Sequence, residues 1–183
     1  MDDDLQAVRR LKDGDIGGLE ALVTRYQTKA VRAAFLIVRD EQTAEDIAQE
    51  TFIRVFERIR RFDEKRPFGP YFLRSVVNAA LDVARQSSKQ GALEGDIESV
   101  EGLLQHALTV EAQAEFNTLK RDIHHALEKL SPRQRAAVVQ RYYLEMNEKE
   151  MAEEWNTAPG TVKWMLNAAR ERLRGLLSKR SAQ

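Results

Sequence analysis

Apolar side chains recur at helical spacing through most of this chain, whereas the strict alternation typical of β-strands is nearly absent. The spacing predicts helices at residues 3–12, 17–38, 41–60, 70–86, 113–129, 132–144, 148–155 and 160–178. The fold class that follows is all-α.

Short polar and proline-containing segments predict where several helices begin. Asp15 and Asp40 precede the second and third helices as N-cap residues. Ser131 is the expected cap of the helix that Pro132 opens, because proline suits the first helical turn. The prolines at 67 and 70, with a glycine between them, predict a loop before the fourth helix.

The helical pattern breaks at residues 86–91, Gln-Ser-Ser-Lys-Gln-Gly, and the charge changes there. Residues 1–88 are balanced in charge, whereas residues 89–115 carry six acidic residues and one basic residue. Residues 116–183 are basic, with 13 cationic against 8 acidic side chains. We therefore expect two small helical domains, 1–88 and 116–183, joined by a flexible acidic linker over 89–115.

Composition removes several function classes. The chain has no cysteine, which excludes disulfides and thiolate metal sites and favours a reducing, cytoplasmic setting. No apolar run approaches the length of about 18 residues that a membrane helix needs, so we expect no membrane insertion. The acidic start, Met-Asp-Asp-Asp, is unlike a secretory signal.

The helix at 41–60 has an unusual outer face. Its inward stripe is Ala44, Ala48, Thr51, Val55 and Ile59. Its opposite face consists of Asp46, Gln49, Ile53 and Glu57, with Glu50 and Phe56 at the edges. An apolar centre with an acidic rim is typical of a protein-docking surface. The alternative is a solvated face with one exposed isoleucine, which is common.

A basic and aromatic segment leads into the helix at 70–86. Phe72, Val76, Ala79, Ala80 and Val83 are expected to face inward. The outward face and the preceding loop carry Arg58, Arg60, Arg61, Phe62, Lys65, Arg66, Phe68, Tyr71, Arg74, Asn78 and Arg85. Cations interleaved with rings suit single-stranded nucleic acid, because cations follow phosphates and rings stack on unpaired bases. Alternatively Phe62 and Phe68 fill the core beneath the loop, and we expect Phe62 to do so.

The last three helices follow the pattern of a helix-turn-helix, whose final helix enters the DNA major groove. In the terminal helix, Val162, Leu166, Ala169, Leu173, Leu176 and Leu177 form the inward stripe. Lys163, Trp164, Asn167, Glu171 and Arg174 point outward. An outward tryptophan indicates a partner surface, or else a ring lying flat on a neighbouring helix.

Catalytic and cofactor motifs are weak. His124 and His125 beside Glu128 lack a second set of metal ligands, so we expect a surface histidine pair and no metal. No phosphate loop or nucleophile motif is present, so we expect no cofactor, no small-molecule substrate and no enzymatic activity.

With these residues in view, the chain resembles the extracytoplasmic-function (ECF) group of bacterial sigma factors. Residues 44–56, AEDIAQETFIRVF, resemble the family's polymerase-binding helix. Residues 68–82 resemble the segment that melts and reads the −10 promoter element, with Tyr71 where the family most often has tryptophan. Residues 130–135, LSPRQR, and 160–163, GTVK, resemble the domain that reads the −35 element.

The resemblance implies three sets of contact residues. Core polymerase would be bound by Asp46, Gln49, Glu50, Phe52, Ile53, Phe56 and Glu57. The −10 strand would be bound by Arg58, Arg60, Arg61, Phe62, Lys65, Tyr71, Arg74, Asn78 and Arg85. The −35 duplex would be bound by Lys149, Thr161, Lys163, Trp164, Asn167, Arg170 and Arg174. Met165 and Ala168 stand at two positions that are commonly basic in the family, so two contacts are expected to be missing.

The resemblance also implies partners: core RNA polymerase through its β′ clamp helices and β flap, promoter DNA, and an anti-sigma factor. The acidic 94–115 segment would run through a basic channel of the polymerase. Two rival interpretations stay open. The first is a dimeric helix-turn-helix regulator, which would bind a palindromic DNA site and would leave the Ile53 face unexplained. The second is a helical enzyme or metal protein, for which this sequence lacks catalytic and metal-ligand motifs.

Overall fold

The computed structural model describes residues 2–90 and 121–180, with side chains placed at 3–87 and 121–176. The chain divides into two compact units, Met1–Leu93 and Glu94–Gln183, and every assigned element in the described residues is helical. Among these residues no helix is both long and apolar enough to cross a lipid bilayer. Most of the predicted linker, residues 91–115, lies outside the described residues.

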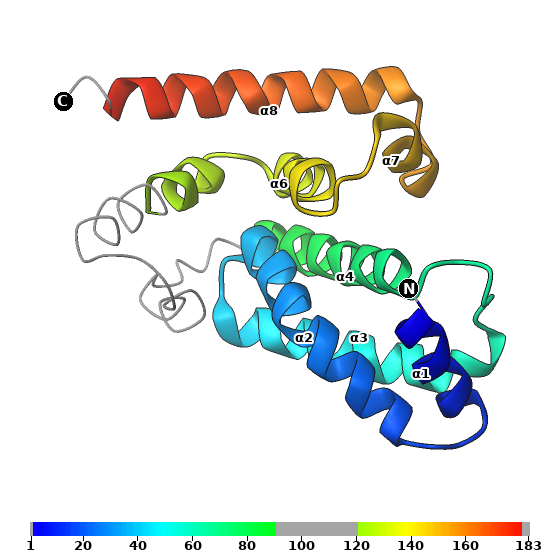
Figure 1. Ribbon diagram of the computed structural model, residues 1–183. Coiled ribbons are helices and arrows are strands. Elements are labelled where there is room, and N and C mark those ends of the chain that lie inside the picture. The colour runs from blue at the N-terminus through cyan, green and yellow to red at the C-terminus, as the bar shows by residue number, and fades with distance from the viewer. Residues whose placement is uncertain (1, 91–120, 181–183) are drawn as a thin grey trace, which may run out of the picture. The chain divides into compact units, whose positions relative to one another are not determined.

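The first unit is a bundle of four helices around a shared interior (Figure 1). Its elements are α1 (Asp2–Lys12), α2 (Gly17–Val38), α3 (Glu41–Glu57), a 3₁₀ turn η1 (Ile59–Arg61) and α4 (Phe68–Gln90). The predicted third helix therefore ends three residues early and continues as η1. The predicted fourth helix begins two residues early, at Phe68.

A side-chain cap starts α3 as the sequence predicts, whereas the predicted Asp15 cap of α2 is wrong. Asp40 has extended backbone geometry and its carboxylate accepts a hydrogen bond from the Thr43 backbone N–H at 2.7 Å, which satisfies an N–H that has no partner within α3. Asp15 accepts from the backbone N–H of Gly17 at 2.8 Å, although the N-cap position of α2 belongs to Ile16. The polar residues in these two turns thus fix where the chain reverses.

Aromatic rings fill the centre of the first unit. Phe72 is fully buried, and its ring centroid lies 4.2 Å from that of Phe52 and 5.8 Å from that of Phe68. Tyr26 packs on the same cluster, 5.8 Å from Phe68. A Cβ at position 69 would overlap the Tyr26 ring, so glycine is required where α4 begins against α2.

The predicted inward stripes are confirmed. Ala44, Ala48, Thr51, Val55 and Ile59 are all buried. In α4 the predicted inward positions are buried or half-buried, and the buried set is wider than predicted, since it also includes Leu73, Val77, Leu81 and Ala84. The wider stripe arises because α4 packs against α1, α2 and α3 at once.

The second unit is described from residue 121. Its elements are a helix over residues 121–128, α6 (Pro132–Val138), a π-helical turn η3 (Val139–Tyr143), α7 (Glu148–Glu154) and α8 (Pro159–Arg180). Figure 1 shows α6 and α7 beside the long α8, and both helices pack against it. The predicted 132–144 helix is therefore an α-helix that widens into a π turn, and residues 113–120 of the predicted 113–129 helix lie outside the described part.

Reciprocal capping boxes start α6 and α7. Ser131 accepts from the Gln134 N–H at 3.3 Å, and the Gln134 side chain accepts from the Ser131 N–H at 3.0 Å. Asn147 and Glu150 repeat this arrangement at α7. The predicted Ser131 cap and Pro132 start are confirmed, and these caps define the spacing between the helices of the helix-turn-helix.

Candidate protein and nucleic-acid interfaces

The outer face of α3 presents the predicted apolar centre with a charged rim. The side chain of Ile53 is 51% exposed and that of Phe56 is 39% exposed. Asp46, Gln49, Glu50 and Glu57 are exposed around them. Glu50 pairs with Arg54 at 3.2 Å along the helix, and Asp46 accepts from Gln42 at 3.2 Å. The face is held in place by local contacts and has room for a partner.

Phe52 was assigned to the same surface, and that assignment is wrong. Its side chain is only 7% exposed, and its ring lies against Phe72 in the core. Phe52 adjoins Ile53 in sequence, but a single helical step rotates it by about 100° toward the bundle interior. Its role is to anchor α3, which in turn fixes the direction in which Ile53 points.

The segment between α3 and α4 is strongly basic on its outside. Arg58, Arg60, Arg61, Lys65 and Arg66 are all exposed. Phe62 is half-buried, with its ring centroid 5.0 Å from that of Tyr71 and 5.8 Å from that of Phe68. The cations therefore surround an aromatic surface, as the sequence predicts for a single-strand interface.

The sequence-based choice between the two loop phenylalanines is wrong. Phe68 fills the core, with 3% of its side chain exposed, and Phe62 keeps part of its surface in solvent. The reason is that α4 begins at Phe68, which puts this ring on the buried stripe one turn before Phe72. Phe62 therefore stays among the residues predicted to contact the −10 strand.

The predicted outer residues of α4 differ in exposure. Tyr71, Arg74 and Asn78 are half-buried, so only part of each side chain is accessible to a ligand. Arg85 is exposed and lies 3.8 Å from Asp82, about 20 Å along the helix from Tyr71. Tyr71 adjoins the basic loop through Phe62, whereas Arg85 lies too far along the helix to share its site.

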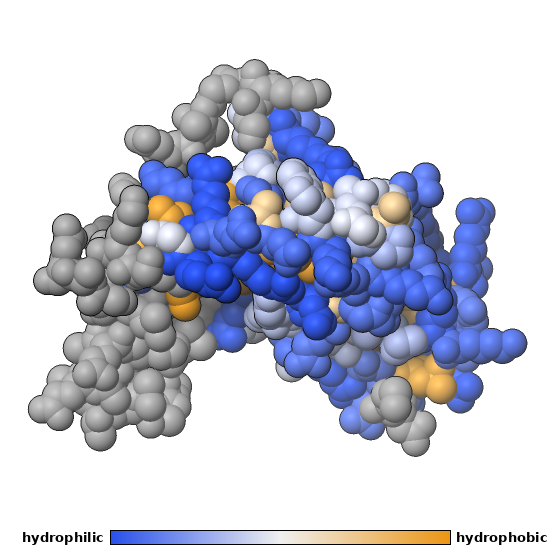
Figure 2. Space-filling model, turned by 90° about the horizontal axis from the view of Figure 1, so that it is seen from above, coloured by the Kyte–Doolittle hydropathy of each residue, from blue (hydrophilic) through white to orange (hydrophobic). Residues whose placement is uncertain are grey.

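The first turns of α8 carry a second polar surface. Thr161, Lys163, Asn167 and Arg174 are exposed, and Trp164 is the most exposed large hydrophobic residue in the described part of the chain, at 70%. Within the second unit, this exposure excludes the alternative of a tryptophan lying flat on a neighbouring helix. Lys149 is exposed on α7. On the face shown in Figure 2, apolar residues form small separate patches within a mostly hydrophilic surface.

Arg170 is held by two neighbours. Its Nε donates to the Tyr142 hydroxyl at 2.7 Å, and its Nη1 donates to the Asn167 side-chain oxygen at 2.9 Å. The guanidinium carbon lies 5.9 Å from the centre of the Tyr142 ring. Tyr142 is 58% exposed and was missed from the sequence, because nothing in the residue pattern places the end of the 132–144 segment beside α8.

Met165 is not a missing DNA contact. It is 7% exposed and packs in the core of the second unit with Met146, Met151, Val162 and Leu166. Its neutral side chain therefore fills a buried position, and the expectation that a contact is lost there is wrong. Ala168 is half-buried and offers no hydrogen-bond donor.

The histidine pair is split between core and surface. His124 is buried, while His125 is exposed and its Nδ1 lies 2.9 Å from Glu128. The described residues hold no group of three or more His, Cys, Asp or Glu side chains arranged to bind a metal ion.

Comparison with known proteins gives these surfaces a family. A model described as Sigma-70 region 2 matches residues 22–90, and a model described as Sigma-70, region 4 matches residues 120–173. The ECF RNA polymerase sigma factor SigW of Bacillus subtilis is 29% identical over 173 residues, covering 91% of this chain and 92% of SigW. The chain belongs to the ECF group of the sigma-70 family. SigM of the same organism is 26% identical over 88% of this chain and 96% of its own.

Solved structures agree with this fold. CnrH, in complex with the cytosolic domain of CnrY, is 21% identical with a TM-score of 0.66, covering 97% of this chain and 98% of its own. The sigma factor RpoE of Bartonella quintana, in complex with the anti-sigma factor NepR, is 18% identical with a TM-score of 0.67, covering 87% and 96%. The all-helical, two-domain architecture of this sigma factor is thus shared with both.

Proposed function

We propose that this sigma factor directs core RNA polymerase to a specific set of promoters, where it recognises and melts the −10 element and reads the −35 element. The observation that carries the proposal is the pair of surfaces on separate units, each within the residues matched by one sigma-70 region. The protein would supply binding and strand separation, and the polymerase would supply the chemistry. It is therefore a non-enzymatic initiation factor acting in the cytoplasm.

The division of labour follows the domains. Residues 1–88 would bind the β′ clamp helices through the outer face of α3, where Ile53 and Phe56 lie within an acidic rim. The same domain would hold the displaced −10 strand on the basic segment between α3 and α4. Residues 116–183 would bind the β flap and place the start of α8 at −35, and residues 89–115 would link the two.

The −35 surface favours a particular kind of recognition. Lys163, Asn167 and Arg174 are exposed, and they would supply phosphate or base contacts. Thr161 lies in the first turn of α8, where backbone N–H groups would bind a phosphate. Trp164 supplies apolar area suited to a thymine methyl group or a sugar edge. Readout would then depend more on groove shape and apolar contact than on paired arginines.

An anti-sigma factor is the expected regulator. The two solved structures that share this fold hold CnrH with the cytosolic domain of CnrY, and RpoE with the anti-sigma factor NepR. In this chain the Ile53 face and the Trp164 surface are two of the exposed apolar areas that such an inhibitor would cover.

Reconstitution tests the proposed function. The purified protein, bacterial core polymerase and a genomic fragment library would be transcribed in vitro, and the 5′ ends mapped. We expect starts downstream of one shared pair of −35 and −10 sequences, only when protein and core are both present. The protein alone should bind duplex DNA poorly. Tight binding of the isolated protein to a palindrome as a dimer, without recruitment of polymerase, would overturn the proposal in favour of a helix-turn-helix regulator.

A further inference from the structure

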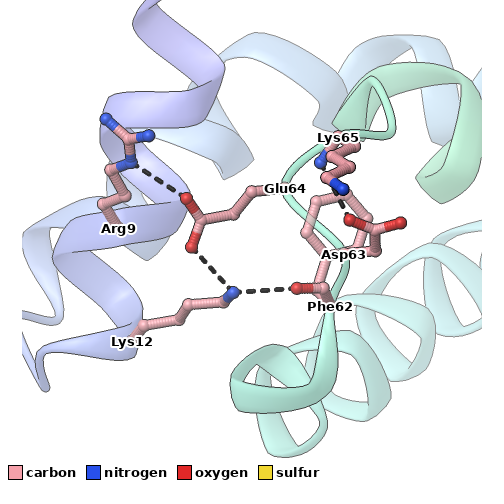
Figure 3. A network of polar contacts seen from close by, with 6 residues as sticks. All are labelled: Arg9, Lys12, Phe62, Asp63, Glu64 and Lys65. Carbon is pink, nitrogen blue, oxygen red and sulfur yellow. Dashed lines mark hydrogen bonds and ion pairs between the residues drawn. The ribbon is translucent and has the colours of Figure 1, made fainter.

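Helix α1 is attached to the basic loop by one carboxylate, as Figure 3 shows. Glu64 accepts from Arg9 Nε through Oε2 and from Lys12 Nζ through Oε1, both at 2.9 Å. These contacts join residues more than fifty positions apart in the sequence. Glu64 is only one-third exposed and the Lys12 side chain is 22% exposed, so the lysine in particular is shielded from solvent.

Lys12 holds the loop at a second point. Its ammonium also donates to the backbone carbonyl of Phe62 at 2.8 Å. The Phe62 ring in turn contacts Tyr71, with 5.0 Å between ring centroids. A continuous series of contacts therefore runs from α1, through the loop backbone, to the aromatic side chain at the start of α4 that we assign to the −10 strand.

The contacts of Glu64 with α1 also offset its negative charge within the basic loop. Asp63 and Glu64 lie in a loop whose other charged residues are cations, and an unpaired carboxylate there would repel a phosphate. Asp63 accepts from the Lys65 backbone N–H at 3.0 Å. Glu64 points toward α1. The hydrogen bond from Lys12, and to a smaller extent the one from Arg9, hold the pKa of Glu64 below the ordinary value for a glutamate. Glu64 is thus paired with two cations of α1, whereas Asp63 stays exposed on the loop.

A cavity of about 300 Å³ separates α1 from the loop. Asp4, Leu5 and Val8 line it from the helix, and Lys65, Arg66 and Pro67 line it from the loop. Glu64 also lines this cavity, and its contacts with Arg9 and Lys12 connect the loop wall to the helix wall. Helix α1 also lies outside residues 22–90, which the Sigma-70 region 2 model matches.

We infer that Glu64 is a positioning residue: together with Arg9 and Lys12 it holds the 62–67 loop in the shape that distinguishes one −10 sequence from another. The inference rests on the proposed function, because it assumes that this loop contacts the −10 strand. It assigns α1 to promoter specificity without a direct DNA contact.

The test uses holoenzyme and a fork-junction DNA whose single-stranded −10 sequence has been selected by the wild-type holoenzyme. The measured quantity is the ratio of Kd values for a scrambled and for the selected −10 sequence. Glu64→Gln keeps the size of the side chain and removes both ion pairs. Lys12→Met removes one ion pair and the hydrogen bond to the Phe62 carbonyl, and leaves the Arg9–Glu64 pair in place. We expect either change to reduce the ratio about fivefold, which is the scale of two partly shielded polar contacts.

Arg10→Gln is the matched control. Arg10 lies on the same helix between Arg9 and Lys12, but pairs with Asp15 at 2.7 Å, beside the turn after α1. Its replacement should leave the Kd ratio unchanged. A swap completes the design: Glu64→Arg should abolish discrimination, and adding Arg9→Glu should restore part of it, since one of the two pairs between helix and loop is rebuilt while Lys12 faces the new arginine.

Three outcomes would overturn the inference. The first is a Kd ratio in Glu64→Gln that stays within twofold of wild type. The second is an equal fall of the Kd ratio in Arg10→Gln, and the third is a double variant, Glu64→Arg with Arg9→Glu, whose Kd ratio is no higher than that of Glu64→Arg alone. A loop variant, Arg60→Gln with Lys65→Gln, separates this failure from failure of the proposed function. If the loop variant weakens binding to both DNAs while Glu64→Gln changes nothing, only the positioning role is wrong. If the loop variant also binds normally, the loop is not the −10 interface.

Discussion

Replacing Ile53 tests the polymerase-binding face of α3 at its apolar centre. Half of this side chain is exposed, so the folded domain gains little from it. A substitution there should change partner binding with almost no change in the free energy of unfolding, because exposed positions away from caps and cores tolerate exchange within about 0.5 kcal/mol.

The expected loss of affinity follows from the area available. Full burial of an isoleucine side chain contributes about 1.5–3 kcal/mol. With 51% still exposed, Ile53 can contribute about 1 kcal/mol on binding, so Ile53→Ala should weaken core binding about fivefold. Ile53→Glu also places a charge in the apolar centre of the contact, which costs further desolvation energy. We expect Ile53→Glu to lose at least about 2 kcal/mol of binding free energy for core polymerase, which is about a thirtyfold increase in Kd.

The assay is competition with labelled wild-type protein for core polymerase, alongside thermal unfolding of each variant. Ile16→Glu is the control, since Ile16 is 63% exposed in the same unit but lies at the start of α2, away from the α3 face. It should bind core polymerase normally. Wild-type affinity of Ile53→Glu, or equal weakening by Ile16→Glu, would refute the assignment of this face.

Three further changes test the two DNA-binding surfaces and the N-cap of α3. Trp164→Ala should reduce discrimination at the −35 element by about 1–3 kcal/mol with little change in Tm, and unchanged −35 selectivity in a reporter series would contradict the DNA role of the indole. Arg60→Ala should reduce the salt dependence of promoter binding by about one phosphate contact, whereas an unchanged slope would place this arginine away from the strand. Asp40→Ala should cost about 1 kcal/mol of stability at neutral pH. Because hydrogen bonds from Thr43 lower the pKa of Asp40 below 3.8, this difference is present above that pH and should shrink as the pH falls through the lowered pKa, which pH-dependent unfolding measures.

Helical periodicity predicted most of the fold because the helices carry apolar stripes, and polar cap residues mark the starts of α3, α6 and α7. The Asp40 and Ser131 caps are examples in which a single side chain sets the first residue of a helix. The outer face of α3 was predicted for the same reason, since residues on one helix are related by fixed rotation. Phe52 was misplaced because the family motif groups residues by sequence, whereas the helix separates Phe52 from Ile53.

Contacts between segments distant in sequence could not be predicted in this way. The ion pairs of Glu64 with Arg9 and Lys12 depend on how α1 packs beside the loop, and no spacing rule relates these positions. The contact of Tyr142 with Arg170 depends on a π turn that widens the end of α6, which the apolar pattern does not indicate. In both cases local signals define the elements, and tertiary packing brings their polar residues together.

The burial of Met165 changes how the −35 surface is interpreted. A neutral residue at a commonly basic position suggested weaker DNA binding, but Met165 packs with Met146 and Leu166, so this side chain stabilises the helix-turn-helix core. Arg170 remains available beside Asn167, and the Tyr142 ring and hydroxyl orient its guanidinium. A guanidinium held in one geometry loses less entropy when it binds DNA than a mobile one. The recognition surface therefore combines an oriented arginine with an exposed tryptophan, and Tyr142→Phe, which keeps the ring but removes the hydroxyl, should weaken −35 binding without changing Tm.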